Sequence, residues 1–151
     1  MNGWFVLLVL LVTLPGARPT QMQAGEPRAR LAEAQKTWEA SKPRSYEFTI
    51  EVRCFCVGIS KTPPSFRVVD GSPSPLGELD PEGQHFYKTR NTIEKLFAAI
   101  DRSLPPYGET ESTVQYDGAL GFPQVADLDP QRESIDDELY FRVTGFRVIE
   151  K

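Results

Sequence analysis

The stretch YEFTIEVRCFCVG, residues 46–58, decides the fold because its apolar and polar residues alternate strictly. One set is apolar and the other mostly polar: Tyr46, Phe48, Ile50, Val52, Cys54 and Cys56 against Glu47, Thr49, Glu51, Arg53 and Phe55. A period of two places successive side chains on opposite faces of a β-strand. We therefore predict a strand with one buried and one solvated face, and we expect both cysteines on the buried face.

Cys54 and Cys56 are the only cysteines of the chain, and a single residue separates them. In a regular strand the Cα atoms of residues i and i+2 lie roughly 6.6 Å apart. A disulfide requires Cβ atoms about 3.5–4.5 Å apart. A link between the two cysteines therefore requires a bend near Phe55, and we expect so short a ring to be easy to reduce.

Three interpretations of the cysteine pair stay open, and so does an intermolecular bridge. We favour an oxidised Cys54–Cys56 link, because the chain is expected to reach an oxidising compartment. The others are buried free thiols that pack as small apolar residues, and redox chemistry or binding of a soft ion such as Cu(I). Zinc requires two further ligands, and His85 is the only histidine of the chain. We therefore expect no metal site and no cofactor.

The N-terminal segment differs in composition from the rest of the chain. WFVLLVLLVTL, residues 4–14, is an unbroken apolar run. As a helix it spans about 16 Å, which is too short for a hydrocarbon core of about 30 Å and typical of a signal peptide. We interpret residues 1–24 as a signal peptide, cleaved after Ala17 or Ala24, or as an uncleaved N-terminal anchor. Residues 25–151 then form a single exported domain, periplasmic or secreted.

Two helices are predicted in that domain. The first covers residues 25–41 and stops before Pro43, since the residue before a proline avoids the helical region. The second covers residues 91–104, where apolar residues recur at i, i+3, i+4 and i+7. Asn91 is its predicted N-cap, and Glu94 completes a capping box.

Further strands are expected along the chain. Residues 66–71 read as a short strand that ends in an Asp-Gly turn, residues 71–83 as an exposed loop, and residues 85–89 as a short return strand. Residues 114–128 read as a hairpin. Residues 137–149 form a long final strand with apolar residues on both sides, so we expect it to be central in the sheet.

Composition and element order agree on the fold class. The chain has 151 residues, of which 40% are apolar and 25% are charged, values typical of one globular domain. Strands and helices do not alternate regularly. This order indicates an α+β fold in which an antiparallel sheet of about five to six strands is covered by two helices. The net charge of −4 argues against nucleic-acid binding, because no basic excess is present to neutralise phosphates.

Several separated stretches carry a family resemblance: SYEFTIEVRCFC, TIEKLFAAI, VQYDGALGFPQVADLD and DDELYFRVTGF, in this order. On these residues the chain resembles a family of small exported bacterial proteins, catalogued as domain of unknown function 6174, over about residues 38–146. The chain departs from the family after Gly71, where SPSPLGELDPEG replaces a valine-rich strand. The resemblance implies export and a single domain, and it names no catalytic residues.

The hairpin offers candidate binding residues: Tyr116, Asp117, Leu120, Phe122 and Pro123. The competing interpretation is turn chemistry, because Asp-Gly and Gly-Phe-Pro are common turn sequences. The acidic residues that follow lack the spacing of a calcium loop: Asp127, Asp129, Asp136, Asp137 and Glu138. We interpret them as a solvated acidic turn and His85 as a surface residue.

No recognisable catalytic motif occurs: the chain contains neither Gly-x-Ser-x-Gly nor a P-loop nor His-Glu-x-x-His. We therefore expect a non-catalytic binding domain of the cell envelope or the extracellular space, not an enzyme. Its partner would be an unidentified protein or envelope component, with membrane contact only through the N-terminal segment. The alternative is a thiol–disulfide redox or copper-handling protein that uses Cys54 and Cys56.

Overall fold

The computed structural model describes residues 27–105, 111–129 and 138–149. The predicted signal segment, residues 1–24, lies outside these residues. The helices are α1 (Pro27–Ser41), α2 (Pro81–Tyr87) and α3 (Ile93–Ser103). The strands are β1 (Ser45–Arg53), β2 (Ser65–Val69), β3 (Ser72–Pro75), β4 (Thr113–Tyr116), β5 (Pro123–Leu128) and β6 (Leu139–Val148).

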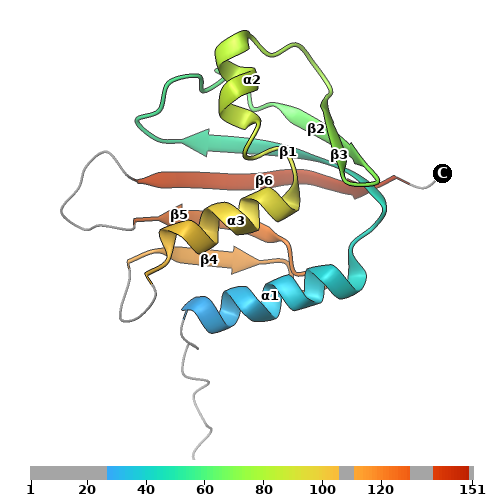
Figure 1. Ribbon diagram of the computed structural model, residues 1–151, viewed down its shortest axis with the longest axis vertical. Coiled ribbons are helices and arrows are strands. Elements are labelled where there is room, and N and C mark those ends of the chain that lie inside the picture. The colour runs from blue at the N-terminus through green and yellow to red at the C-terminus, as the bar shows by residue number, and fades with distance from the viewer. Residues whose placement is uncertain (1–26, 106–110, 130–137, 150–151) are drawn as a thin grey trace, which may run out of the picture.

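The six strands form one sheet in the order β3-β2-β1-β6-β5-β4 (Figure 1). Every neighbouring pair is antiparallel. Two three-stranded meanders, one from each half of the chain, therefore join where β1 pairs with β6. The predicted α+β class with an antiparallel sheet is confirmed, and so is the central position of the final strand.

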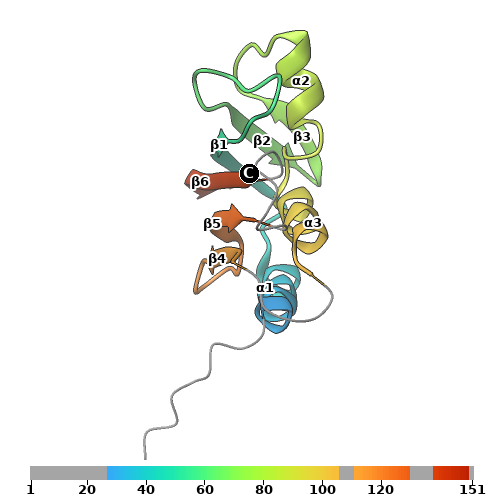
Figure 2. The ribbon, with the colours of Figure 1, turned by 90° about the vertical axis from the view of Figure 1, so that its left-hand side faces the viewer.

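All three helices lie on one side of the sheet, and no described element lies on the other side (Figure 2). We call the uncovered side the open face. The core fills the space between sheet and helices. Its largest fully buried side chains come from all three helices and four of the six strands: Trp38, Phe48, Ile50, Phe66, Val68, Tyr87, Ile93, Leu96, Ile100, Pro123, Leu128 and Phe141.

The segment after the Asp70–Gly71 turn differs from the prediction. Residues 72–75 form the edge strand β3 and not a loop. Proline suits this position because an edge strand can lack some ladder donors.

The predicted return strand at residues 85–89 is also wrong, because most of it belongs to α2. Asp80 caps this helix by accepting a hydrogen bond from the backbone N–H of Gly83 at 2.6 Å, and Pro81 occupies the first turn. Asp-Pro at a helix start is a sequence signal that could have identified it. Phe86 and Tyr87 pack from α2 into the core.

The apolar face of α3 is buried as predicted, but its N-cap is Thr92 and not Asn91. The Thr92 hydroxyl accepts a hydrogen bond from the backbone N–H of Lys95 at 3.3 Å. Asn91 instead accepts one from the Lys95 ammonium at 2.6 Å.

Candidate functional site

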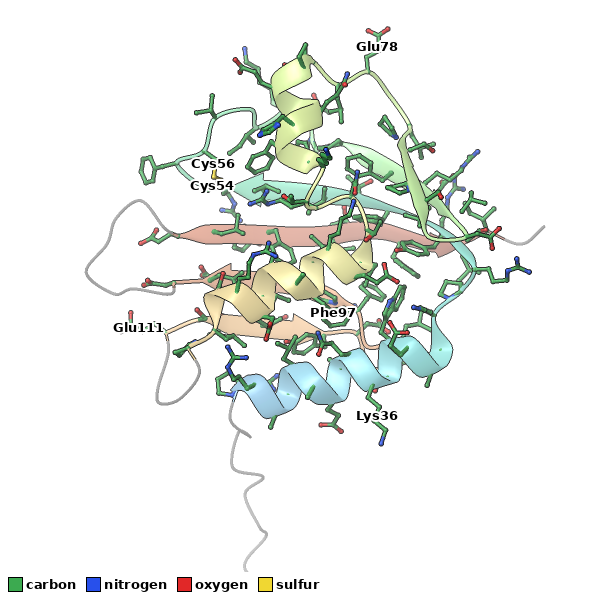
Figure 3. The ribbon with its side chains drawn as sticks, viewed as in Figure 1. Lys36, Cys54, Cys56, Glu78, Phe97 and Glu111 are labelled. Atoms are coloured by element: carbon green, nitrogen blue, oxygen red, sulfur yellow. A yellow bond between two sulfur atoms is a disulfide. The ribbon has the colours of Figure 1, made fainter. Side chains whose placement is uncertain are left out.

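The structure links Cys54 and Cys56 in a disulfide at the end of β1, seen as the yellow bond in Figure 3. Their Cα atoms lie 5.2 Å apart, closer than residues i and i+2 of a regular strand, so the backbone bends at Phe55. Of the three interpretations of the pair, the structure therefore shows the oxidised one.

The predicted burial of the pair is wrong in part. β1 ends at Arg53, immediately before Cys54, because the backbone of residues 54–56 cannot keep the extended strand geometry and also close the disulfide ring. Cys54 is half-buried and packs against the edge of the core, whereas Cys56 is exposed.

The bend exposes two large apolar side chains. Phe55 is 78% exposed and Val57 is 81% exposed. The next most exposed large apolar side chain in the described part of the chain is Val148, at 51%. We call Phe55 and Val57, together with the Cys54–Cys56 disulfide, the apolar tip.

The backbone after the apolar tip is held against α2. Gly58 has a φ of +86°, and a Cβ placed there would lie 2.7 Å from the backbone oxygen of Glu82 on α2. A side chain at this position would therefore separate the loop from the helix. Burial raises the pKa of the Tyr87 hydroxyl, which is also hydrogen-bonded to Ser60 of the same loop. The apolar tip thus projects from a loop that is fixed on its far side.

On the open face, the strand end beside the disulfide is also fixed. The guanidinium of Arg53 lies 3.9 Å from the ring centroid of Tyr140 on β6 and pairs with Glu51 at 3.4 Å. Further along the sheet, Glu47 accepts hydrogen bonds from Arg67 and Arg147, at 2.7 Å each, and these lower the pKa of its carboxyl group.

The predicted hairpin residues lie together at the turn that connects β4 to β5. Phe122 and Pro123 are buried, and Phe122 stacks on Phe146 of β6 with ring centroids 4.3 Å apart. Asp117 accepts hydrogen bonds from the backbone N–H groups of residues 119 and 120, at 3.0 and 2.7 Å. Leu120 is half-buried against the core. Four of the five candidates therefore have structural contacts of the kind expected for a turn.

Tyr116 is the fifth hairpin candidate. Its ring stacks on Phe97 of α3, and its hydroxyl group is buried without a hydrogen-bond partner. Burial raises the pKa of that hydroxyl to about 12. The residue borders a hollow of about 240 Å³ between α1 and the hairpin, lined also by Arg30, Thr37 and Asp117.

A cluster around Glu94 was not anticipated. Its carboxylate accepts hydrogen bonds from the indole N–H of Trp38 at 3.0 Å and the hydroxyl of Tyr46 at 3.3 Å. Burial alone would raise the pKa of Glu94, but its hydrogen bonds and the charge of Lys42 lower it. Glu94 therefore ties α3 to α1 and β1, and does not complete the predicted capping box.

The remaining candidates do not converge on one site. Asp127 is exposed on the open face, and His85 is exposed on α2. Asp136 and Asp137 lie outside the described residues. Within residues 27–105, 111–129 and 138–149, no three His, Cys, Asp or Glu side chains are grouped as metal ligands would be.

Comparison with known protein families gives a match over most of the chain. The model of the family described as "Family of unknown function (DUF6174)" matches residues 30–148. No curated protein and no solved structure matches the chain. No helix in the described part of the chain has the length and apolar character needed to cross a membrane.

Proposed function

The chain belongs to the family of unknown function DUF6174, whose description names no activity, and we propose its function from the geometry. The protein is a non-catalytic binding domain. Its apolar tip contacts a partner in the cell envelope or outside the cell. The observation that carries the proposal is the exposure of Phe55 and Val57, at 78% and 81%, beside a disulfide.

Free energy favours covering these side chains. Burying a valine or phenylalanine side chain fully is worth about 1.5–3 kcal/mol, and aromatic anchors near the centre of an interface contribute disproportionately to affinity. The disulfide bends the backbone at Phe55, and Gly58 fixes the next turn against α2. The tip is therefore largely ordered before it meets a partner, which lowers the entropic cost of binding.

Two features of the chain support a place outside the cytoplasm. A disulfide between its only cysteines suits an oxidising compartment. The apolar run at residues 4–14 has the length of a signal-peptide core. The proposed partner is accordingly an envelope or extracellular protein with an apolar cavity that accepts Phe55.

Site-specific photo-crosslinking in the host cell tests the proposal. A photoreactive phenylalanine at position 55 is expected to form a discrete adduct, recovered in the periplasmic or secreted fraction. The same group at Leu76, which is 46% exposed after β3, is the control and is expected to form no such adduct.

A second variant separates the tip from general surface adhesion. Phe55→Ser/Val57→Ser is expected to abolish competition by the purified domain for the adduct, while Val69→Ser/Leu76→Ser competes like wild type. Equal competition by both double variants, or an adduct cytoplasmic in origin, would refute the proposal.

A further inference from the structure

The disulfide and the two exposed apolar residues lie within four consecutive residues, 54–57, and this juxtaposition suggests chemistry as well as binding. We propose that Cys54–Cys56 is a thiol–disulfide exchange site that oxidises dithiols in apolar protein segments. The proposal rests on the proposed function for the docking of those segments, but the exchange step itself depends only on the disulfide.

The two cysteines are unequally exposed. Cys56 is exposed and follows the bend, whereas Cys54 is half-buried and packs against the edge of the core. Exchange begins when an external thiolate attacks a disulfide sulfur, so its rate depends on access to that sulfur. The geometry therefore makes Cys56 the attacked sulfur and Cys54 the leaving thiolate.

Stabilisation of the fold does not explain this disulfide well. The stabilisation from a cross-link grows with the length of chain that it closes, and only Phe55 lies between these two cysteines. No second element is tied to β1 by the link, because both sulfurs belong to one bend. Exposed disulfides are the ones found in regulatory and exchange roles.

The exchange step is balanced without any further group. A thiolate of the partner attacks Sγ of Cys56, forming a mixed disulfide and releasing Cys54 as a thiolate. The partner's second thiolate then attacks the partner's first sulfur, which is bonded to Cys56 in the mixed disulfide. This forms the partner's disulfide and releases Cys56 as a thiolate. The partner dithiol loses two electrons and two protons, and the Cys54–Cys56 disulfide gains them to become two thiols. Each oxidised molecule therefore oxidises one dithiol, as a reagent and not as a catalyst.

Phe55 and Val57 determine which dithiols react fastest. Each flanks one or both cysteines in the sequence, and both are largely exposed. An apolar segment that covers them positions its thiols beside Cys56, which raises the effective concentration of the attacking group.

The test uses the oxidised full chain and two reduced synthetic peptides. Both peptides carry two cysteines separated by two residues, flanked by leucine and phenylalanine in one and by serine in the other. Thiol alkylation followed by mass spectrometry counts oxidised peptide and reduced protein over time. We expect one peptide oxidised per protein, with the apolar peptide about tenfold faster, which corresponds to about 1.4 kcal/mol of contact with the tip.

Single variants identify the attacked sulfur. Cys54→Ser leaves Cys56 as a free exposed thiol, which is expected to capture an added one-cysteine peptide, activated as a disulfide with an aromatic thiol, and to release the aromatic thiolate. Cys56→Ser leaves the half-buried Cys54, which is expected to capture it more slowly. Circular dichroism shows whether each variant is folded, and the wild-type stoichiometry decides the exchange step without any variant.

The outcomes separate the two proposals. If both peptides stay reduced in the presence of the oxidised chain, the exchange proposal is overturned and the binding proposal is untouched. If the serine-flanked peptide reacts as fast as the apolar one, exchange is supported and docking on the tip is overturned. Faster capture by the Cys56→Ser variant would overturn the assignment of Cys56 as the attacked sulfur.

Discussion

Gly121 shows how a single residue connects the hairpin to α1. Its φ is +80°, and a Cβ there would lie 2.6 Å from the backbone oxygen of Ala34 and 3.1 Å from the backbone nitrogen of Trp38. Because both are backbone atoms of a packed helix, neither can move aside easily. We expect Gly121→Ala to lower the free energy of unfolding by about 2–4 kcal/mol, from strain at positive φ and from displacement of α1.

Urea denaturation of wild type and variant measures that loss, and Gly118→Ala is the matched control. Gly118 belongs to the same turn, has ordinary φ, and has open space where a Cβ would be. Its substitution is expected to change the stability by less than about 0.5 kcal/mol. Equal losses in the two variants would show that the turn itself, and not its contact with α1, is sensitive.

The sequence identified this segment as turn chemistry without showing what the turn packs against. Asp117 could be assigned to the turn because short polar side chains bond to nearby backbone N–H groups. The contact of Gly121 with α1 joins residues far apart in the chain, and no local pattern encodes it. The contacts of Glu94 could not be predicted for the same reason, because its partners Trp38 and Tyr46 lie on other elements.

At the scale of elements, the start of α3 gives a direct test of the corrected cap. Thr92 is the N-cap, the role predicted for Asn91, and accepts the backbone hydrogen bond of Lys95. We expect Thr92→Ala to destabilise the domain by about 1 kcal/mol. Asn91→Ala removes only a contact with the Lys95 ammonium and should cost less than about 0.5 kcal/mol. Thermal unfolding of the two variants side by side gives the comparison, and a larger loss in Asn91→Ala would contradict the assignment.

Elements with a clear period were predictable, and those whose geometry depends on a local bond were not. The alternation through residues 46–53 and the apolar face of α3 were visible because the sheet and the helix each bury one side. The alternation continues through Cys54 and Cys56, yet β1 ends before them, since the disulfide bends a backbone that the pattern treats as straight. The short helix α2 contains too few residues to show a period.

For the whole molecule, the class of fold followed from element order, but the pairing of β1 with β6 did not. That pairing joins the two halves of the chain into one sheet. The alternating pattern of a strand does not show which strand lies beside it, so the pairing could not be predicted. The candidate site was found in part. The cysteine pair stands out in the sequence, whereas the exposure of Phe55 and Val57 depends on the bend. The predicted solvated face of β1 is confirmed only in part: Arg53 is exposed, but Glu47 is buried in its contacts with Arg67 and Arg147.

The stability of the whole domain should depend little on the disulfide. Loop-closure entropy for a link that spans three residues corresponds to only about 1.5 kcal/mol, against a total of about 5–15 kcal/mol for a typical domain. The pairing of β1 with β6 ends at Arg53, before the bend, and Cys54 meets the core only at its edge. We therefore expect Cys54→Ser/Cys56→Ser to remain folded, with a loss of about 2 kcal/mol or less, measured by urea denaturation.

Wild-type protein treated with a reductant is the control for this double variant, because it removes the bond without changing a side chain. Both samples should keep a single cooperative transition, and their midpoints should agree. Loss of cooperativity in either would show that the link supports the sheet and would oppose reversible exchange. A domain that keeps its fold in both redox states can instead give up its disulfide at the apolar tip and regain it, because only the bend around Phe55 has to change.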